Sequence, residues 1–292
     1  MKEGVIIKGI GGFYDVLSNN EIYRCRARGK FRKQKITPMV GDHVRFTPET
    51  EISEGSLEEI YPRKNSLRRP AVANITNLAV VMSAFQPEPD LLLIDKLIIS
   101  AERMNISILL VVNKIDLATQ DQIDELLNDY KPSSYPIYCV SSKYGQGMEE
   151  LARGLEGITT LAGQSGVGKS SIINHLHPSF EAEVGDVSVK HKRGRHTTRH
   201  VELLNLPEGG MIVDTPGFSQ MELADYEEVE LQEYYPEYEK YRHDCYFNGC
   251  IHVSEPNCKV QDAVEKGELP SGRYQRYVHF IKEIKEYRRN AW

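Results

Sequence analysis

Apolar and polar positions follow three different rhythms along the chain, and the first is found in residues 1–65. Short apolar runs are separated there by Gly, Asn and Pro, in the pattern of brief strands, and no helical periodicity interrupts them. The predicted strands are EGVIIKG, GFYDVLS, EIYRCRARG and DHVRFTP. Several short antiparallel strands in a segment of this length favour a small all-β barrel, and an oligonucleotide-binding (OB) barrel is one candidate.

From about residue 72 apolar strands alternate with amphipathic helices. ISILLVVNK is a continuous apolar run, which is typical of a parallel strand buried on both faces. The other predicted strands are NLAVVMSAF, PIYCVSS, ITTLAGQ, HVELLNL and GGMIVDTPG. The predicted helices are DLLLIDKLIISAERMN, QDQIDELLNDY, GMEELARGLE and KSSIINHLH. This alternation predicts a six-stranded α/β domain over residues 66–222.

After about residue 222 the pattern becomes helical and acidic, and SGRYQRYVHFIKEIKEYRRNAW predicts a C-terminal amphipathic helix. The predicted fold is therefore multidomain. It has an all-β OB-type barrel at 1–65, a central α/β domain at 66–222 and a mostly helical domain at 223–292.

The composition of the chain bears on its cellular location and on whether its cysteines form disulfides. The chain has 292 residues, 40% of them apolar, and no run is long enough to span a bilayer. The first residues lack the features of a signal peptide, so we expect a cytoplasmic protein without a membrane partner. An odd number of cysteines, five, argues against a disulfide framework. Cys25 and Cys139 lie on predicted strands and are expected to be packing residues.

Charge separates the first domain from the rest. Residues 1–70 hold 14 Lys and Arg against 9 Asp and Glu, an excess of five positive charges in a chain whose net charge is -6. Such a module suggests a polyanionic partner, although a solvated basic face explains the charge equally well. The aromatic residues between these charges could stack on the bases of single-stranded nucleic acid, or could be core. They are Phe13, Tyr14, Tyr23, Phe31 and Phe46, of which Phe46 is better explained as core.

The segment GQSGVGKS fits the pattern of a phosphate-binding loop and lies between a predicted strand and a predicted helix. Gly163, Gly166 and Gly168 would let the backbone curl so that its N–H groups converge on phosphates. Lys169 would reach the β- and γ-phosphates, and Ser170 would ligate Mg²⁺. We call residues 163–170 the phosphate loop.

The segment NKID directly follows an apolar strand and predicts a loop that reads guanine. The Asp116 carboxylate can accept two hydrogen bonds from guanine but would be left unpaired against adenine, a mismatch that can discriminate by roughly 10⁴-fold. Asn113 would tie neighbouring loops together, and the stem of Lys114 would cover the base. A second loop, SSK at residues 141–143, also follows a strand and would close around the base.

The segment DTPG predicts a sensor for the γ-phosphate. Asp214 can hold Mg²⁺ through water, and the Gly217 N–H can contact the γ-phosphate. Between it and the phosphate loop, HTT lies in a run too basic and too rich in Gly and Thr to be core. Thr197 or Thr198 could supply a hydroxyl that contacts Mg²⁺ only in the triphosphate state.

Catalysis is the part of the site with the weakest signal. GTPases of the Ras type place a Gln directly after this motif to orient water, but this chain has Phe218 there. Slow turnover by the protein alone is therefore expected, with a partner completing the site. His196 is a candidate for positioning water; the alternative is a loop residue that contacts RNA or is disordered.

Three of the five cysteines cluster near the C-terminus. Cys245, Cys250 and Cys258 can supply three thiolates, and one imidazole would complete a tetrahedral zinc site. On spacing alone, either His252 or His243 could be the fourth ligand. Buried free cysteines are the alternative to a metal site.

The order NKID, SSK, GQSGVGKS, HTT, DTPG resembles that of a circularly permuted GTPase. With the basic barrel before it and the Cys/His cluster after it, the whole chain resembles the ribosome-small-subunit-dependent GTPase A family. The resemblance implies a GTPase that acts in late assembly of the small (30S) ribosomal subunit, binds its rRNA and is stimulated by the subunit. It also favours His252 as the fourth zinc ligand. The expected cofactors are GTP or GDP, Mg²⁺ and one Zn²⁺ per chain, and the protein is expected to be a monomer.

The candidate site residues fall into four groups. Nucleotide is expected to contact Asn113, Lys114, Ile115, Asp116, Ser141, Ser142, Lys143, Gly163, Gln164, Ser165, Gly166, Val167, Gly168, Lys169, Ser170, Ser171, Asp214 and Gly217. The expected Mg²⁺ residues are Ser170, Thr198 and Asp214. The expected catalytic residues are Lys169, His196, Thr197 and Thr198. The expected zinc ligands are Cys245, Cys250, His252 and Cys258.

Two other functions remain possible from the sequence. The chain could be a GTP-gated tether or sensor that binds RNA and in which hydrolysis is incidental. A kinase that uses ATP is disfavoured by NKID, which is suited to guanine.

Overall fold

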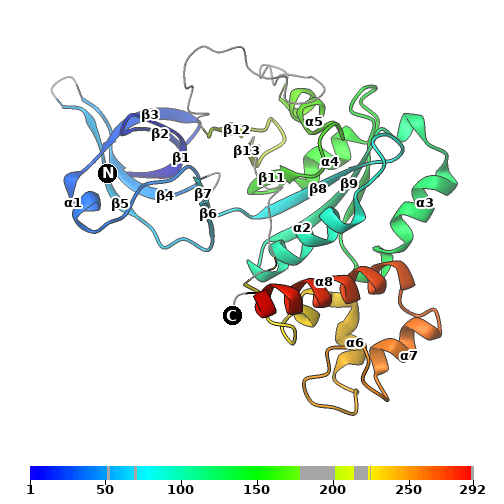
Figure 1. Cartoon of the computed structure of the whole chain (residues 1–292). Coiled ribbons are helices and arrows are strands. Elements are labelled where there is room, and N and C mark those ends of the chain that lie inside the picture. The colour runs from blue at the N-terminus through cyan, green and yellow to red at the C-terminus, as the bar shows by residue number, and fades with distance from the viewer. Residues whose placement is uncertain (51–52, 69–70, 178–200, 214–222, 224, 291–292) are drawn as a thin grey trace.

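The first domain is a closed five-stranded barrel with the strand order β1-β2-β3-β5-β4 (Figure 1). The computed structural model describes the chain except for residues 51–52, 69–70, 178–200, 214–222, 224 and 291–292. The barrel strands are β1 (Lys2–Ile10), β2 (Phe13–Ser18), β3 (Glu21–Ala27), β4 (His43–Thr47) and β5 (Gly55–Ile60). Four of the five strand pairings are antiparallel and β3 pairs with β5 in parallel, which confirms the predicted OB-type barrel.

The barrel core consists of the side chains that point inward from alternating positions. Ile6, Val16, Val44, Phe46 and Leu57 are each 0% exposed. The expectation that Phe46 is core is therefore confirmed, and Cys25 is also buried there.

Two features of the barrel were not expected. The short helix α1 (Gly29–Lys33) lies between β3 and β4, so the expectation of an uninterrupted run of strands was wrong. Its one buried side chain, Phe31, anchors the helix to the barrel. The strand β5 was missed because its sequence, GSLEEI, places two adjacent glutamates in the strand.

A short hairpin joins the barrel to the next domain. Its strands are β6 (Ser66–Arg68) and β7 (Ala71–Ala73), and Val72 is 0% exposed. The Asn74 side-chain amide donates to the Gly41 carbonyl at 2.9 Å, and the Asn74 side-chain oxygen accepts from the Lys64 N–H at 2.9 Å. These bonds tie the end of the hairpin to the barrel.

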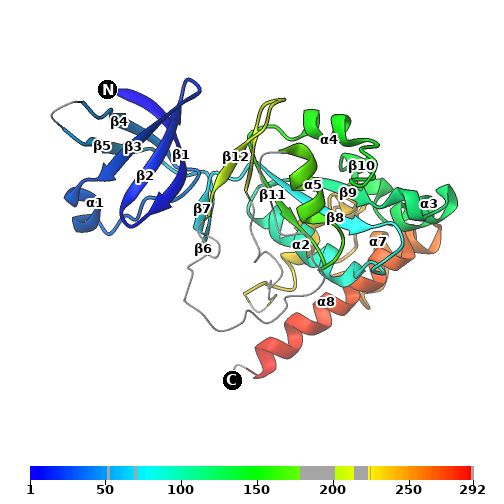
Figure 2. The same ribbon diagram turned by 90° about the horizontal axis from the view of Figure 1, so that it is seen from above.

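The central domain is a six-stranded sheet with the order β10-β9-β8-β11-β13-β12 (Figure 2). The strands are β8 (Asn77–Ser83), β9 (Ser107–Asn113), β10 (Ile137–Cys139), β11 (Ile158–Ala162), β12 (Leu203–Asn205) and β13 (Met211–Val213). All neighbours are parallel except β12 and β13. Every residue of β8 and β11 is buried, as expected for strands covered on both faces.

Helices cover both faces of this sheet. Alternate residues of β8 point to opposite sides, so Leu78 packs with α2 (Leu91–Arg103) and α3 (Gln120–Asn128), while Ala79 packs with α4 (Met148–Gly154) and α5 (Lys169–Leu176). The short helices η1 (Ile115–Leu117) and η2 (Lys131–Ser133) follow β9 and α3. The predicted α/β domain is confirmed.

The third part of the chain, which we call the C-terminal module, packs on the outer side of α2, with α8 running beneath it in Figure 1. It contains η3 (Leu231–Tyr234), η4 (Pro236–Tyr238), α6 (Glu239–Arg242), α7 (Lys259–Glu265) and α8 (Ser271–Asn290). The predicted amphipathic C-terminal helix is α8, whose buried residues include Tyr277, Phe280, Ile281 and Ile284. Among the described residues, no helix has the length and apolarity needed to cross a membrane.

Candidate functional site

The predicted nucleotide loops meet at one edge of the sheet. β9 ends at Asn113, β11 ends immediately before Gly163, and β10 ends two residues before Ser141. These strands are parallel, so their carboxyl ends lie on the same side, which is where open α/β sheets bind ligands. β8 lies between β9 and β11, so its end lies between the two loops.

The phosphate loop has the backbone that its glycines were expected to allow. The φ angle is +143° at Gly163 and +99° at Gly168, conformations that side chains with a Cβ rarely adopt. A Cβ at Gly163 would clash with the Val81 carbonyl, and one at Gly168 would clash with the side-chain amide of Asn113. α5 begins directly afterwards at Lys169, so the N-terminus of the helix faces the loop.

Within this loop Lys169 holds the curled backbone from inside. Its Nζ donates to the carbonyl oxygens of Gly163 and Gln164, each at 2.8 Å. Ser165 and Gly166 are exposed, whereas Val167 is buried in the core beneath the loop. Ser170 and Ser171 are half-buried at the start of α5. An ammonium group therefore already lies within a loop whose tip is open to solvent.

Asn113 ties the three loops together, as its motif predicts. Its side chain is fully buried, its Nδ2 donates to the Val167 carbonyl at 2.9 Å, and its Oδ1 accepts from the Ser142 N–H at 3.0 Å. Lys114 has a left-handed backbone, with φ of 64°, and its Nζ donates to the Gly166 carbonyl at 2.6 Å. The NKID loop and the phosphate loop are thus held together.

The Asp116 carboxylate is oriented from one side. Ser141 Oγ, which is fully buried, donates to Asp116 Oδ1 at 2.5 Å. Ile115 lies beside it in η1, and its N–H donates to the Val140 carbonyl at 3.3 Å. Lys143 is exposed, and its Nζ lies 4.8 Å from the centre of the Tyr144 ring. These contacts place the carboxylate and the SSK loop side by side.

A fourth loop, residues 84–90, follows β8 and has no recognisable motif in the sequence. Its Gln86 carbonyl accepts from Lys114 Nζ at 2.7 Å and from Ser83 Oγ at 2.8 Å. Its Asp90 N–H donates to Gln164 Oε1 of the phosphate loop at 3.3 Å. This loop belongs to the site because β8 lies between β9 and β11 in the sheet. The order of strands in a sheet is not encoded in a local motif, so the sequence alone does not indicate the loop.

The remaining residues predicted for the nucleotide site fall outside the part of the chain that the structure describes. They are His196, Thr197, Thr198, Asp214, Gly217 and Phe218. Their roles stay predictions.

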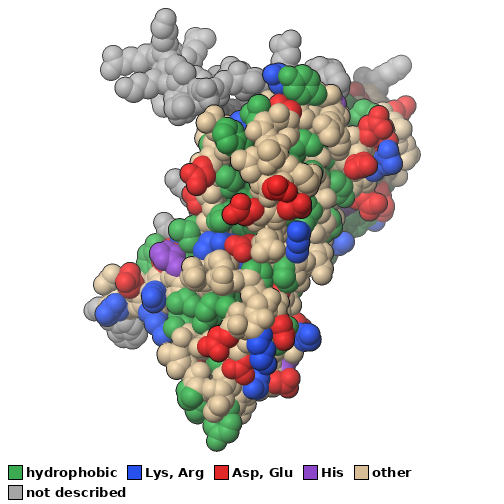
Figure 3. All heavy atoms as spheres, turned by 90° about the vertical axis from the view of Figure 1, so that its right-hand side faces the viewer, with side chains coloured by type: hydrophobic (Ala, Val, Ile, Leu, Met, Phe, Trp, Pro, Cys, Tyr) green, Lys and Arg blue, Asp and Glu red, His purple; other side chains and the backbone are tan. Residues whose placement is uncertain are grey.

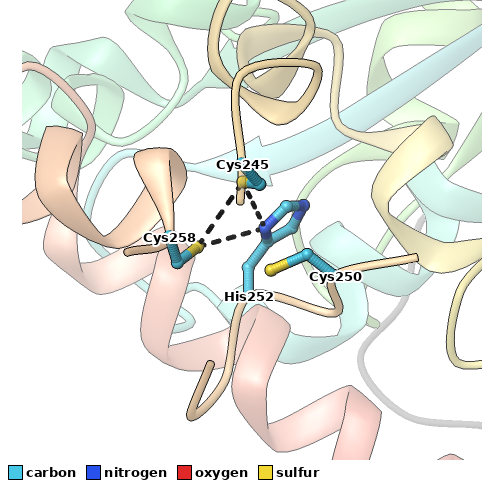
Figure 4. Close-up of side chains that lie close together, drawn as sticks. All are labelled: Cys245, Cys250, His252 and Cys258. Carbon is cyan, nitrogen blue, oxygen red and sulfur yellow. Dashed lines mark hydrogen bonds between the residues drawn. The ribbon is translucent and has the colours of Figure 1, made fainter. Parts of the chain in front are cut away.

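The Cys/His cluster assembles in the C-terminal module, as Figure 4 shows. The ligand atoms of Cys245, Cys250, His252 and Cys258 all lie within 4.8 Å of one another. His252 Nδ1 faces two sulfurs, at 3.2 Å from Cys258 Sγ and 3.6 Å from Cys245 Sγ. His243 is instead exposed, and its Nε2 lies 3.1 Å from Glu239 Oε1. Of the two histidines that spacing left open, His252 is therefore the one that the fold brings to the cysteines.

A glutamine fixes the tautomer of His252. Gln232 Nε2 donates to the Cys250 and Val229 carbonyls at 3.2 and 3.0 Å, so its Oε1 must face His252 Nε2, at 2.8 Å. His252 Nε2 then carries the proton, and the lone pair of Nδ1 points at the sulfurs. This is the arrangement that a metal-ligating histidine requires.

The chemistry of the cluster fits a soft divalent cation. Burial lowers the pKa of His252 to about 4, which keeps its imidazole neutral and able to ligate. Burial raises the pKa of Cys250 to about 12 and also raises that of Cys258, so thiolates here need a cation to stabilise them. Three sulfurs and one imidazole nitrogen are the donor set of a closed structural zinc site.

The outer face of the barrel combines basic and aromatic side chains. The guanidinium carbons of Arg24 and Arg26 lie 5.0 and 5.1 Å from the centre of the half-buried Phe13 ring. Tyr23, by contrast, packs on Phe46 with ring centres 5.2 Å apart. Figure 3 views the molecule from the side opposite the barrel, where acidic and basic side chains are interspersed. Of the aromatic residues predicted to contact bases, Phe13 is therefore the one flanked by arginines.

A cavity of about 230 Å³ lies between the barrel and the α/β domain, away from the nucleotide loops. The β1–β2 turn, the segment 38–40 and Val201 line it. Among the described residues, none of the side chains that line it is charged.

Comparison with known proteins covers nearly the whole chain. The family model described as "RsgA GTPase" matches residues 60–224, and that described as "RsgA N-terminal domain" matches residues 3–55. A protein of Ruminiclostridium cellulolyticum named "Small ribosomal subunit biogenesis GTPase RsgA" is 46% identical over 98% of this chain and 95% of its own length. A relative with the same name from a Geobacillus species is 46% identical over 98% of both chains.

Two solved structures resemble the whole molecule. The crystal structure of YjeQ from Thermotoga maritima matches with a TM-score of 0.85 and 37% identity over 97% of this chain and 98% of that one. The structure described as YloQ, a circularly permuted GTPase, matches with a TM-score of 0.82 and 39% identity over 98% of this chain and 96% of that one.

Proposed function

Because this chain belongs to the RsgA GTPase family, we propose that it hydrolyses GTP as a factor in late assembly of the small ribosomal subunit, binding rRNA and being stimulated by the subunit. The observation that carries the proposal is the fixed junction of the base-reading and phosphate loops through Asn113 and Lys114. That junction supplies the means to select a nucleotide by its base and to act at its phosphates. The assignment to the small ribosomal subunit rests on the names of the relatives.

In this proposal the phosphate loop binds the triphosphate. The curled backbone from Gly163 to Gly168 and the N-terminus of α5 present N–H groups to the phosphate oxygens. Lys169, which now donates to two loop carbonyls, exchanges these partners for the β- and γ-phosphates. The ammonium gains Coulomb attraction from the negatively charged phosphates that neutral carbonyls do not supply, which favours the exchange.

Base selection rests on Asp116. Ser141 holds one carboxylate oxygen, and the carboxylate accepts from the N1–H and the 2-amino group of guanine. The Lys114 side chain, anchored on the Gly166 and Gln86 carbonyls, covers one face of the base. Ser142 and Lys143 close the loop on the other side.

Ser170 and, as predicted from the sequence, Asp214 and Thr198 would hold Mg²⁺, which would supply positive charge to neutralise the phosphates. Gly217 would sense the γ-phosphate, and His196 would position the attacking water. Slow turnover without the ribosomal partner remains expected, because Phe218 cannot orient water.

Each of the three parts of the chain has its own role in this proposal. We assign the barrel, residues 1–65, to rRNA and residues 66–222 to GTP. Residues 223–292 would hold one Zn²⁺ through Cys245, Cys250, His252 and Cys258, a cluster that is compatible with it. The protein would act as a monomer in the cytoplasm, where its ribosomal partner is found.

Co-sedimentation with purified small subunits tests the proposal. We expect the wild-type chain to sediment with subunits in the presence of a non-hydrolysable GTP analogue and to be released with GDP. Phe13→Ala should weaken this binding by about 1–3 kcal/mol, because a stacking platform is lost. Arg24→Ala should lower the slope of log affinity against log salt by about one unit.

Arg153→Ala is the matched control, since Arg153 is an exposed arginine of the α/β domain that pairs with Glu149 across one helical turn. It should bind subunits as the wild type does. Equal sedimentation with GDP and with the GTP analogue would exclude a nucleotide-gated factor. Binding to subunits could depend on the nucleotide while subunits leave the rate of GTP hydrolysis unchanged. That result would instead favour a GTP-gated RNA tether.

A further inference from the structure

Helix α2 lies between the nucleotide loops and the C-terminal module and contacts both. We propose that α2 links the two sites, so that guanine nucleotide strengthens the retention of zinc in the C-terminal module, and zinc strengthens the binding of nucleotide. This inference rests on the proposed function and concerns how the same nucleotide site is regulated.

The N-terminal end of α2 is attached to the nucleotide loops. Asp90 caps the helix by accepting from the Leu93 N–H at 3.0 Å, and its own N–H donates to Gln164 Oε1 of the phosphate loop. The segment that leads into this cap, residues 84–90, accepts from Lys114 through the Gln86 carbonyl. A shift of α2 along its axis would therefore move the wall of the nucleotide site.

The middle of α2 is bound to α8 by buried charges. Asp95 is 1% exposed, with one carboxylate oxygen 2.5 Å from Arg276 Nε and the other 3.4 Å from Arg273 Nη1. Arg276 also donates to Asp129, beyond the end of α3, at 2.9 Å. Arg273 is also 1% exposed, and its Nε lies 2.6 Å from Glu237 Oε1 in a close ion pair whose angle is not that of a hydrogen bond.

The remaining contacts extend this attachment along the helix. Lys96 Nζ lies 2.7 Å from Glu283 Oε1 of α8, and Arg103 donates to the Asp225 carbonyl at 3.0 Å. Ile99 is 0% exposed and belongs to the hydrophobic core of the C-terminal module. One face of α2 is thus part of the interior of the C-terminal module.

The same helix α8 holds the loop of the zinc cluster from its other side. Tyr274 Oη donates to the His252 carbonyl at 2.8 Å, and Tyr277 Oη donates to the Ile251 carbonyl at 3.0 Å. Residues 273 and 276 of α8 therefore face α2, while residues 274 and 277 fix the backbone at a zinc ligand. A continuous series of contacts runs from the cluster through α8 and α2 to Gln164.

Metal binding supplies the two states that such a link requires. Structural zinc sites fold with their metal, so a C-terminal module without zinc loses the packing of its loop on α8. Displacement of α8 would leave Asp95 buried without its arginines, which is costly for a charged group. α2 then favours a position unsuited to the nucleotide loops. Linkage requires the reverse effect to have the same size.

Zinc release from the full-length, zinc-loaded protein tests the link. The probe is transfer of zinc to an excess of a chromophoric chelator, with and without saturating GDP, while displacement of a fluorescent GDP analogue verifies that GDP is bound. Release through local opening follows the population of the open state. We expect GDP to slow release at least about fivefold in the wild type, the lower range of typical coupling between sites.

Two variants of α8 separate this link from general stabilisation. Arg276→Gln removes the main partner of Asp95 and should reduce the effect of GDP to less than about twofold. Lys285→Gln is the matched control, because Lys285 pairs with Glu228 within the C-terminal module, and it should keep the wild-type ratio. If Arg276→Gln does not fold, Glu283→Gln, which breaks the partly exposed pair with Lys96, should give an intermediate ratio.

Each outcome decides the inference. Equal zinc release with and without GDP, while GDP is bound, overturns the link and leaves the proposed function standing. GDP could also slow zinc release by the same factor in wild type, Arg276→Gln and Lys285→Gln. That result would show that zinc is released by global unfolding and would also overturn the link. Failure to bind GDP at all would overturn the proposed function and the link together.

Discussion

Replacing Asp116 by asparagine is expected to convert the preference for guanine into a preference for xanthine. Ser141 Oγ donates to Asp116 Oδ1, so the side-chain oxygen of the asparagine keeps that place and its NH₂ group takes the position of the other oxygen. An NH₂ group there faces the hydrogen-bond donors of guanine, whereas xanthine has a carbonyl at C2. Because a buried polar mismatch costs up to about 10⁴-fold, GDP affinity should fall by roughly that factor while XDP affinity rises.

Displacement of a fluorescent guanine nucleotide by GDP, XDP and ADP measures this change. Asp124→Asn is the control, since Asp124 is an exposed acid of α3 whose pair with Lys131 lies on the surface. That variant should bind GDP as the wild type does. An Asp116→Asn protein with undiminished GDP affinity would mean that this loop does not read the base.

Removing one ligand of the Cys/His cluster is expected to abolish zinc binding and unfold the C-terminal module. Cys258 is 2% exposed, and its sulfur lies 3.2 Å from His252 Nδ1, so Cys258→Ala deletes a central donor and leaves an incomplete set. Structural zinc contributes about 10–16 kcal/mol in isolated zinc-finger peptides, which exceeds the stability of a typical domain. The change should reduce bound zinc from one to none per chain.

Native mass spectrometry gives the zinc content, and limited proteolysis reports the state of the C-terminal module. Cys139→Ala is the matched control, because Cys139 is a half-buried free cysteine on β10 with no part in the cluster. It should retain one zinc and resist proteolysis. Stoichiometric zinc in Cys258→Ala would contradict the assignment of the ligands.

The features that could be predicted from the sequence are those encoded locally. The phosphate loop and NKID each follow a buried strand directly, so the apolar run that precedes each motif is enough to place it at a strand end. The zinc ligands could be found because soft donors of this kind are rarely clustered without a metal. His252 and His243 could not be distinguished by spacing, since the choice depends on Gln232 and on the fold of the loop.

The features that were missed depend on contacts between distant residues. Asp95 looks like a solvated charge on an amphipathic helix, yet its partners Arg273 and Arg276 come 178 and 181 residues later. The Gln86 carbonyl is a backbone group, and every residue has one, so the sequence does not indicate its role. The helix α1 has five residues, too few for helical periodicity to emerge. Each of these required the tertiary structure.

Hydrolysis of GTP in the presence of small ribosomal subunits tests the central proposal most directly. Phosphate release should be slow for the protein alone, should rise at least tenfold (about 1.4 kcal/mol) when purified subunits are added, and should not rise with free rRNA or tRNA. The same low rate with and without subunits, in a protein that binds GTP, would contradict the proposal that the subunit completes the catalytic site.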